Sequence, residues 1–248
     1  MMRRRNLKVW STYSKGSEDA LALNFGTSAG PNCWRGCAHH SKSTAKNPTH
    51  ACYAENGEQR PDRQPLHAKL KRHDAMPPAQ LCAAALLELQ WLESRGILPD
   101  FVRFSGFGSV PMPEIARADK LFLAQFRALC KWLVDREIDV HFPAEGYLKT
   151  RFYRALVDDL ICVRESAQTR ERFIRAAGAV SCVAGSMNDS VKERIRIAWE
   201  IAKARTMASG RKCGVCPAIT HRKKCGPKGV GCNMCTRENI DVVYPIHR

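Results

Sequence analysis

The chain of 248 residues is 44% hydrophobic and 26% charged, an ordinary composition for a folded protein, which excludes wholesale disorder. Its longest apolar run, Leu81–Leu87, ends at Glu88 after seven residues, whereas a membrane-spanning helix needs about 20. The 40 Lys and Arg residues against 24 Asp and Glu give a formal net charge of +16. This excess favours a polyanionic partner, most simply nucleic acid, and a basic protein without such a partner is the alternative.

Residues 1–63 are predicted to form an N-terminal segment with little regular structure. Leu21–Phe25 is its one strand-like stretch, and residues 31–63 hold three cysteines without any hydrophobic period. Such a composition is typical of a loop that is organised by a ligand rather than by a core. The basic start, Met1–Arg5, is followed by polar residues instead of an apolar stretch, so no secretion signal is expected.

Residues 64–207 are predicted to form a β/α core. After a basic stretch, the Pro77-Pro78 pair opens a helix that runs to about Ser94, with its apolar residues on one face. Strands and helices then alternate: strands over 101–104, 138–142, 160–163 and 179–183, and helices over 114–135, 147–156, 170–177 and 190–206. This alternation predicts a parallel sheet, which right-handed crossovers would curl into a partial or complete β/α barrel.

The ends of the predicted strands are polar, and ligands meet a parallel sheet just beyond the carboxyl ends of its strands. We therefore expect this rim to bind cofactor and substrate, although ordinary loops have a similar composition. Gly106 is the expected cofactor contact, and the candidate catalytic residues are Arg103, Ser105, Glu145, Arg164 and Glu165.

Residues 208–248 are predicted to form a cysteine-rich metal-binding segment that ends in a closing strand, Ile240–Ile246. Two pairs with ligand spacing, Cys213-x2-Cys216 and Cys232-x2-Cys235, lie fifteen residues apart, and Cys225 is a fifth candidate between them. Two such pairs can complete a tetrahedron of thiolates around one ion. Zinc and an iron–sulfur cluster both accept four thiolates, so the spacing leaves the metal open.

A second cysteine group, in the N-terminal segment, consists of Cys33, Cys37 and Cys52. With a nearby histidine these residues could form a Cys3His zinc site. They could also hold a 4Fe-4S cluster with one iron left open for a cofactor or substrate. The clustering of eight of the twelve cysteines favours metal ligands in a reducing compartment over disulfides. The other four, Cys82, Cys130, Cys162 and Cys182, are expected to be buried apolar residues.

Both cysteine groups carry a resemblance to the phage gene product 88 family. It rests on Leu23–Ser28, on Cys33, Cys37 and Ala51-Cys52-Tyr53-Ala54, on Val102–Gly106, and on the tail from Cys216-Pro217-Ala218 to Val243-Tyr244-Pro245-Ile246-His247. The resemblance implies a phage or prophage protein that works in the cytoplasm of a bacterial host. It favours Cys216, Cys225, Cys232 and Cys235 as one ligand set, with Cys213 as an addition, whereas spacing alone favours Cys213 over Cys225. The family pattern has an acidic residue where this chain has Phe107.

The order of parts also resembles that of radical SAM enzymes, which pair an open-iron cluster near the N-terminus with a partial barrel. Fourteen residues separate Cys37 from Cys52, a wider spacing than those enzymes use. The resemblance implies a 4Fe-4S cluster at the N-terminal cysteines and S-adenosylmethionine as its cofactor. Zinc or a second iron–sulfur cluster would then occupy the C-terminal cysteines.

Two functions from different classes follow from these features. The first is an iron–sulfur enzyme, of radical SAM type in its most specific form, that acts on nucleic acid or a nucleotide-derived substrate. The second is a zinc-stabilised nucleic-acid-binding protein without catalytic activity, which the basic residues around the C-terminal cysteines favour. Hydrolysis or group transfer at zinc is less favoured, because the chain has no HExxH, GxSxG or phosphate-binding glycine motif. No membrane partner is expected, and the sequence leaves the oligomeric state open.

Overall fold

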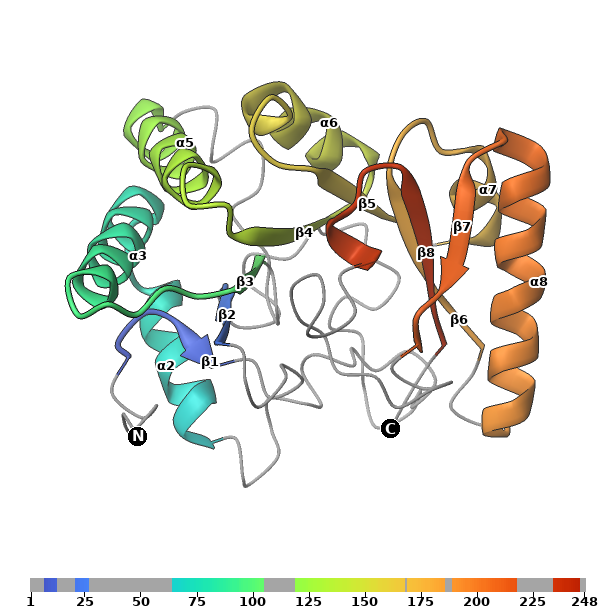
Figure 1. Cartoon of the computed structure of the whole chain (residues 1–248), viewed down its shortest axis with the longest axis horizontal. Coiled ribbons are helices and arrows are strands. Elements are labelled where there is room, and N and C mark those ends of the chain that lie inside the picture. Colours follow the sequence, from blue (N-terminus) through green and yellow to red (C-terminus); the bar gives the residue numbers. More distant parts are fainter. Residues whose placement is uncertain are drawn as a thin grey trace.

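The fold is built on one open, mostly parallel β-sheet with helices on its outer side (Figure 1). The computed structural model describes residues 7–12, 21–26, 64–104, 119–167, 169–185, 189–217 and 234–245. The strands are β1 (Ser11–Thr12), β2 (Ala22–Phe25), β3 (Phe101–Phe104), β4 (Asp139–Glu145), β5 (Val163–Ala167), β6 (Val180–Ala184), β7 (Lys212–Val215) and β8 (Ile240–Pro245).

The sheet has the order β1-β2-β3-β4-β5-β6-β8-β7, and every neighbouring pair is parallel except β1 with β2. In Figure 1 the strands follow an arch from β2 through β4 to β7. β1 and β7 are the two edges of the described sheet, so the arch is open, which is consistent with a partial β/α barrel. The predicted α/β class with a parallel sheet is confirmed, and strands from all three predicted segments of the chain join this one sheet.

The helices are α2 (Gln64–Asp74), α3 (Pro78–Glu93), α5 (Lys120–Val134), α6 (Tyr147–Val157), α7 (Arg170–Arg175) and α8 (Val191–Ser209). Local chemistry sets several ends. The Asp119 carboxylate accepts a hydrogen bond from the Phe122 N–H at 2.8 Å, and the Ser190 hydroxyl accepts one from the Glu193 N–H at 3.2 Å. Gly210 ends α8 with a φ of 68°. No helix in these described ranges is long and apolar enough to span a membrane.

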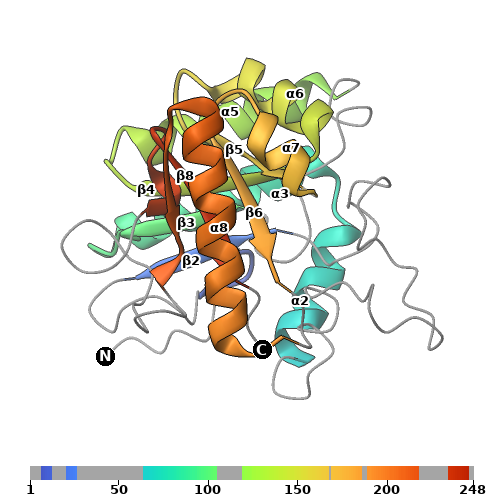
Figure 2. The ribbon, with the colours of Figure 1, turned by 90° about the vertical axis from the view of Figure 1, so that its right-hand side faces the viewer.

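The core lies between the sheet and the helices on its convex side. Alternate residues of β2, β3 and β4 pack beneath α3 and α5, among them Phe25, Phe104 and Phe142, which are at most 2% exposed. At the other end of the arch, β6, β7 and β8 pack against α7 and α8, and α8 runs along the outer side of these strands (Figure 2). Because strand side chains alternate between faces, the residues between the core positions belong to the concave face.

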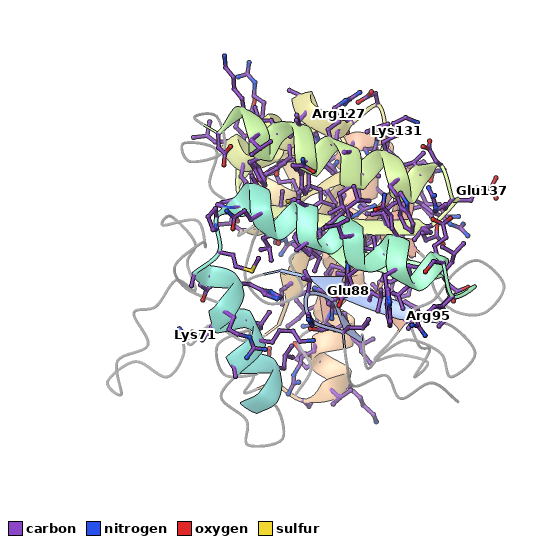
Figure 3. The ribbon with its side chains drawn as sticks, turned by 90° about the vertical axis from the view of Figure 1, so that its left-hand side faces the viewer. Lys71, Glu88, Arg95, Arg127, Lys131 and Glu137 are labelled. Carbon is purple, nitrogen blue, oxygen red and sulfur yellow. The ribbon has the colours of Figure 1, made fainter. Side chains whose placement is uncertain are left out.

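The helix α3 also fixes the first strand. The Glu88 carboxylate accepts hydrogen bonds from the backbone N–H groups of Val9 and Trp10, both at 2.9 Å. Figure 3 shows α3 and α5 side by side on the outside of the arch, with Arg127 and Lys131 on the far side of α5. A carboxylate on the inner side of α3 therefore ties the chain that precedes β1 to the layer of helices.

Several elements differ from the sequence prediction. The helix predicted over 114–135 begins at Lys120, because Asp119 caps its N-terminus. The basic stretch before Pro77 forms α2, and part of the cysteine-rich C-terminal segment forms β7, neither of which was predicted. The strand predicted over 160–163 is wrong in register, since β5 begins at Val163 and continues through Arg164, Glu165 and Ser166. A polar run can occupy this inner strand because the buried Arg164 and Glu165 both have hydrogen-bond partners.

Candidate functional site at the concave face

Polar side chains from neighbouring strands lie in a row across the concave face. Asn24 of β2 is opposite Arg103 of β3, and Arg103 is opposite His141 of β4. The next residue of β4 on the same face is Pro143, which is opposite Arg164 of β5. Adjacent strands are about 4.8 Å apart, so these side chains are near neighbours. The concave face thus carries two guanidinium groups, an imidazole and an amide within a few strands.

His141 lies at the centre of this row and is 5% exposed. Burial lowers its pKa well below the usual value, and the positive charges of Arg103 and Arg164 lower the pKa further. The imidazole is therefore neutral at physiological pH. The sequence prediction did not include His141, although a polar residue between the apolar Val140 and Phe142 is the signal of a strand with one functional face.

Tyr244, near the carboxyl end of β8, connects His141 to the C-terminal cysteines. Its hydroxyl lies 3.4 Å from His141 Nε2 and donates a hydrogen bond to Cys235 Sγ at 3.0 Å. Burial raises the pKa of Tyr244 well above its usual value, and the electrostatic interaction with Cys235 raises it further. Cys216, directly after β7, donates its backbone N–H to the Val243 carbonyl at 2.8 Å and so lies beside the end of β8.

Arg164, a predicted catalytic residue, is fully buried and holds backbone groups. Its guanidinium donates to the carbonyls of Val180 at 3.0 Å, Cys235 at 3.2 Å and Arg237 at 2.7 Å. Nη1 also lies 4.0 Å from Oδ1 of the buried Asp241. These contacts tie the short 3-10 helix η3 (Met234–Thr236), which carries Cys235, to the concave side of the sheet.

Glu165, another predicted catalytic residue, lies on the opposite face of the sheet. It alternates with Arg164 and Ser166, lies on the same face as Val163 and Ala167, which pack against the outer helices, and is 1% exposed. Arg172 of α7 donates to its two carboxylate oxygens at 2.5 and 2.8 Å. The alternation of strand side chains therefore turns this carboxylate away from Arg103 and His141 and into an ion pair between β5 and α7.

The three described cysteines of the C-terminal group are divided between the two faces. Cys213 alternates with Gly214, packs against the core beneath α8, and lies near Cys182 of β6. Burial raises the pKa of the Cys213 thiol to about 12, and the negative charge of Asp241 contributes. Cys216 and Cys235, in contrast, both lie near Tyr244. Cys82, Cys130 and Cys182 are buried as expected, and burial raises the pKa of each thiol. Cys162, which was also expected to be buried, is only partly buried.

The remaining predicted site residues lie outside the described part of the chain: Ser105, Gly106, Cys33, Cys37, Cys52, Cys225 and Cys232. Glu145 is the last residue of β4, but its side chain is likewise outside the described part. Within the described ranges, which contain three of the eight predicted cysteine ligands, no group of three or more His, Cys, Asp or Glu residues could hold a metal ion.

No family model, curated protein or solved structure matches the chain. The resemblances to the phage gene product 88 family and to radical SAM enzymes therefore rest on the residues and the order of parts given above. Any function must be argued from the sheet, its concave face and the cysteines.

Proposed function

We propose that this chain is an iron–sulfur enzyme of phage or prophage type. It acts on a nucleic acid or a nucleotide-derived substrate at the concave face of its partial barrel. Cys33, Cys37 and Cys52 hold a 4Fe-4S cluster. Cys216, Cys225, Cys232 and Cys235 hold zinc or a second cluster. Cys213 is left out of this set because it packs beneath α8.

The observation that carries the proposal is that the two connections with the cysteines start at the same edge of the sheet. In the sequence, the N-terminal group follows β2, and the C-terminal group begins with Cys216, directly after β7. β2 and β7 point in the same direction, so both connections begin at the carboxyl edge of the sheet. This is the edge where enzymes with parallel sheets bind their ligands.

The concave face supports an anionic substrate. Arg103 and Arg164 place two permanent positive charges there, and Arg164 is held in place by backbone carbonyls. Asn24 Oδ1 is buried without a hydrogen-bond partner among the described residues, so it can accept a hydrogen bond from a bound molecule. Arg103, His141 and Asn24 are thus the proposed substrate contacts, together with the predicted Ser105 and Glu145. Glu165 is not included, because it faces α7.

Three thiolates on four irons leave one iron free, which is the basis for proposing S-adenosylmethionine as cofactor. A cluster held by Cys33, Cys37 and Cys52 would, when reduced, supply one electron for the cleavage of this cofactor. In this chain the protein would contribute the cluster ligands and a cationic surface that holds the substrate next to them.

Metal analysis after purification without oxygen tests the proposal. We expect brown protein with about four irons at the N-terminal cysteines. Replacement of Cys33, Cys37 and Cys52 together by Ala should remove this iron and leave the C-terminal metal in place. Cys162→Ala is the matched control, because this half-buried cysteine belongs to neither group, and it should keep both metals.

Reduction in the presence of S-adenosylmethionine then tests the radical chemistry. The wild-type protein should release 5′-deoxyadenosine, and the triple alanine variant should release none. Colourless protein with two zinc ions would contradict the iron–sulfur proposal. The zinc-stabilised nucleic-acid-binding protein would then be the better explanation of the basic charge.

A further inference from the structure

We infer that Arg164 and Tyr244 are positioning residues of the C-terminal metal site, where they hold and tune Cys235 as a ligand. The inference rests on the proposed function, in which Cys235 binds metal. It adds to that function two residues that fix the geometry and the electron density of one ligand.

Arg164 fixes the backbone of the ligand. Its guanidinium donates to the carbonyl of Cys235 itself and to that of Arg237, on both sides of Thr236, and to Val180 of β6. A guanidinium is a rigid planar fork, so three such bonds define the position of the turn relative to the sheet. Because the Arg164 side chain is fully buried, water does not compete for these donors.

Tyr244 acts on the sulfur. A metal-bound thiolate has no proton and can only accept, so the hydrogen bond at 3.0 Å must run from the Tyr244 hydroxyl to Cys235 Sγ. The hydroxyl oxygen can in turn accept from His141 Nε2–H, which lies 3.4 Å away. This chain of two contacts joins the sulfur to the concave face. Hydrogen bonds of this kind withdraw electron density from a ligand and hold its orientation.

The hydroxyl is the part of Tyr244 that this role requires. A phenylalanine would fill the same space in β8 and keep the same ring contact with His141, whose centroid lies 6.5 Å from that of Tyr244. Tyr244→Phe therefore removes only the hydroxyl, and with it the hydrogen bond to sulfur and the contact with His141 Nε2. Tyr147→Phe is the matched control, because Tyr147 is 50% exposed and its ring lies beneath the Arg172 guanidinium, far along the chain from the cysteines.

The test uses Co²⁺ as the probe, in full-length protein in which Cys33, Cys37 and Cys52 are alanine, so that the thiolate-to-cobalt absorption reports the C-terminal site alone. Tyr244→Phe should bind Co²⁺ about 10- to 100-fold more weakly, the usual effect of removing a hydrogen bond to a metal ligand. Its charge-transfer band should move to longer wavelength, because a thiolate without the hydrogen bond is more electron-rich. Tyr147→Phe should change neither quantity.

Arg164→Lys provides the second measurement. Lysine keeps the positive charge but cannot make the three hydrogen bonds of the planar guanidinium, so we expect faster release of Co²⁺ to a chelator. Circular dichroism checks that the helix content is unchanged. If Tyr244→Phe and its parent have the same Co²⁺ affinity and the same charge-transfer band, the inference is overturned, while the assignment of the cysteines as metal ligands stands. Absence of any thiolate–cobalt band in the parent would instead overturn the assignment of these cysteines as ligands.

Discussion

A single buried carboxylate, Asp241, holds together the end of the arch that carries the C-terminal cysteines. It is fully buried and accepts from Arg205 Nε of α8 at 2.8 Å, from Arg211 Nε at 3.2 Å and from the Val180 N–H at 3.1 Å. Asp241→Asn would leave the equally buried Arg205 without its counter-charge. We expect this change to lower the free energy of unfolding by about 3–5 kcal/mol, measured by urea denaturation.

The matched control is Asp159→Asn, which removes a carboxylate from an ion pair with Arg127 on the solvent-exposed surface. Water already solvates both of these groups, so the urea midpoint should change little. An Asp241→Asn midpoint as high as that of the control would show that the buried network contributes nothing to the stability of this end of the sheet.

At the residue scale, sequence alone could identify polar strand ends but not the face to which each residue belongs. Arg103 and Glu165 are both polar residues in or beside short predicted strands, yet one lies on the concave face and the other beneath α7. The face to which a strand residue belongs depends on the bounds of the strand. The predicted strand began three residues before β5 does, so the faces of Arg164 and Glu165 could not be assigned. His141 would have been found if the apolar residues on both sides of it had been weighed.

At the scale of elements, the turn from β6 towards α8 depends on Gly185. Its φ is 87°, and a Cβ at this position would lie 2.9 Å from Arg194 Cγ and 3.4 Å from Arg194 Cα. Gly185→Ala adds a steric conflict with α8 to the backbone strain of about 1–3 kcal/mol that a positive φ imposes. We expect a loss of stability larger than strain alone would give, measured as a lower urea midpoint.

Gly96 after α3 separates the two contributions. Its φ is 70°, and nothing lies within 4 Å of a Cβ placed there, so Gly96→Ala reports the strain without the steric conflict. Gly185→Ala should therefore be the less stable of the two variants. Equal midpoints would mean that α8 moves freely away from β6, contrary to its close packing on the sheet.

The elements that the sequence predicted well are those in which local signals agree. The Phe101–Phe104 strand has the predicted bounds, and the helix capped by Ser190 begins where its capping residues indicate. The unpredicted β7 is different, because its four residues include a lysine, a cysteine and a glycine. It is a strand because β8 pairs with it and Val215 packs in the core, and neither of these interactions is visible in the local sequence.

At the scale of the whole molecule, the helices and the strands divide the surface into a convex side and a concave side with different chemistry. The convex side is a layer of helices over an apolar core, whereas the concave side carries the arginines and the histidine of the proposed site. A net charge of +16 would attract any polyanion at long range, wherever the positive charges lie. Binding at a specific site differs from this long-range attraction, because it depends on the positions of the positive side chains that contact phosphates.

The basic residues beside the C-terminal cysteines allow these two kinds of binding to be told apart. If Arg222, Lys223 and Lys224 bind phosphates, their reversal to Glu should weaken binding to duplex DNA or RNA. It should also flatten the dependence of affinity on salt, by about 0.9 in the logarithmic slope for each phosphate that the variant no longer neutralises. Fluorescence anisotropy with a labelled duplex at several salt concentrations measures both quantities.

The control reverses three exposed cations on the convex helices, Lys120 of α5, Arg151 of α6 and Lys203 of α8. The two triple variants have the same net charge, so a purely long-range effect would lower the affinity of both equally. We expect the convex variant to keep the wild-type slope, because these three side chains neutralise no phosphate, while slope and affinity should fall together in the variant near the cysteines. Identical behaviour of the two variants would remove the C-terminal segment from the interface and reduce nucleic-acid binding to a consequence of net charge.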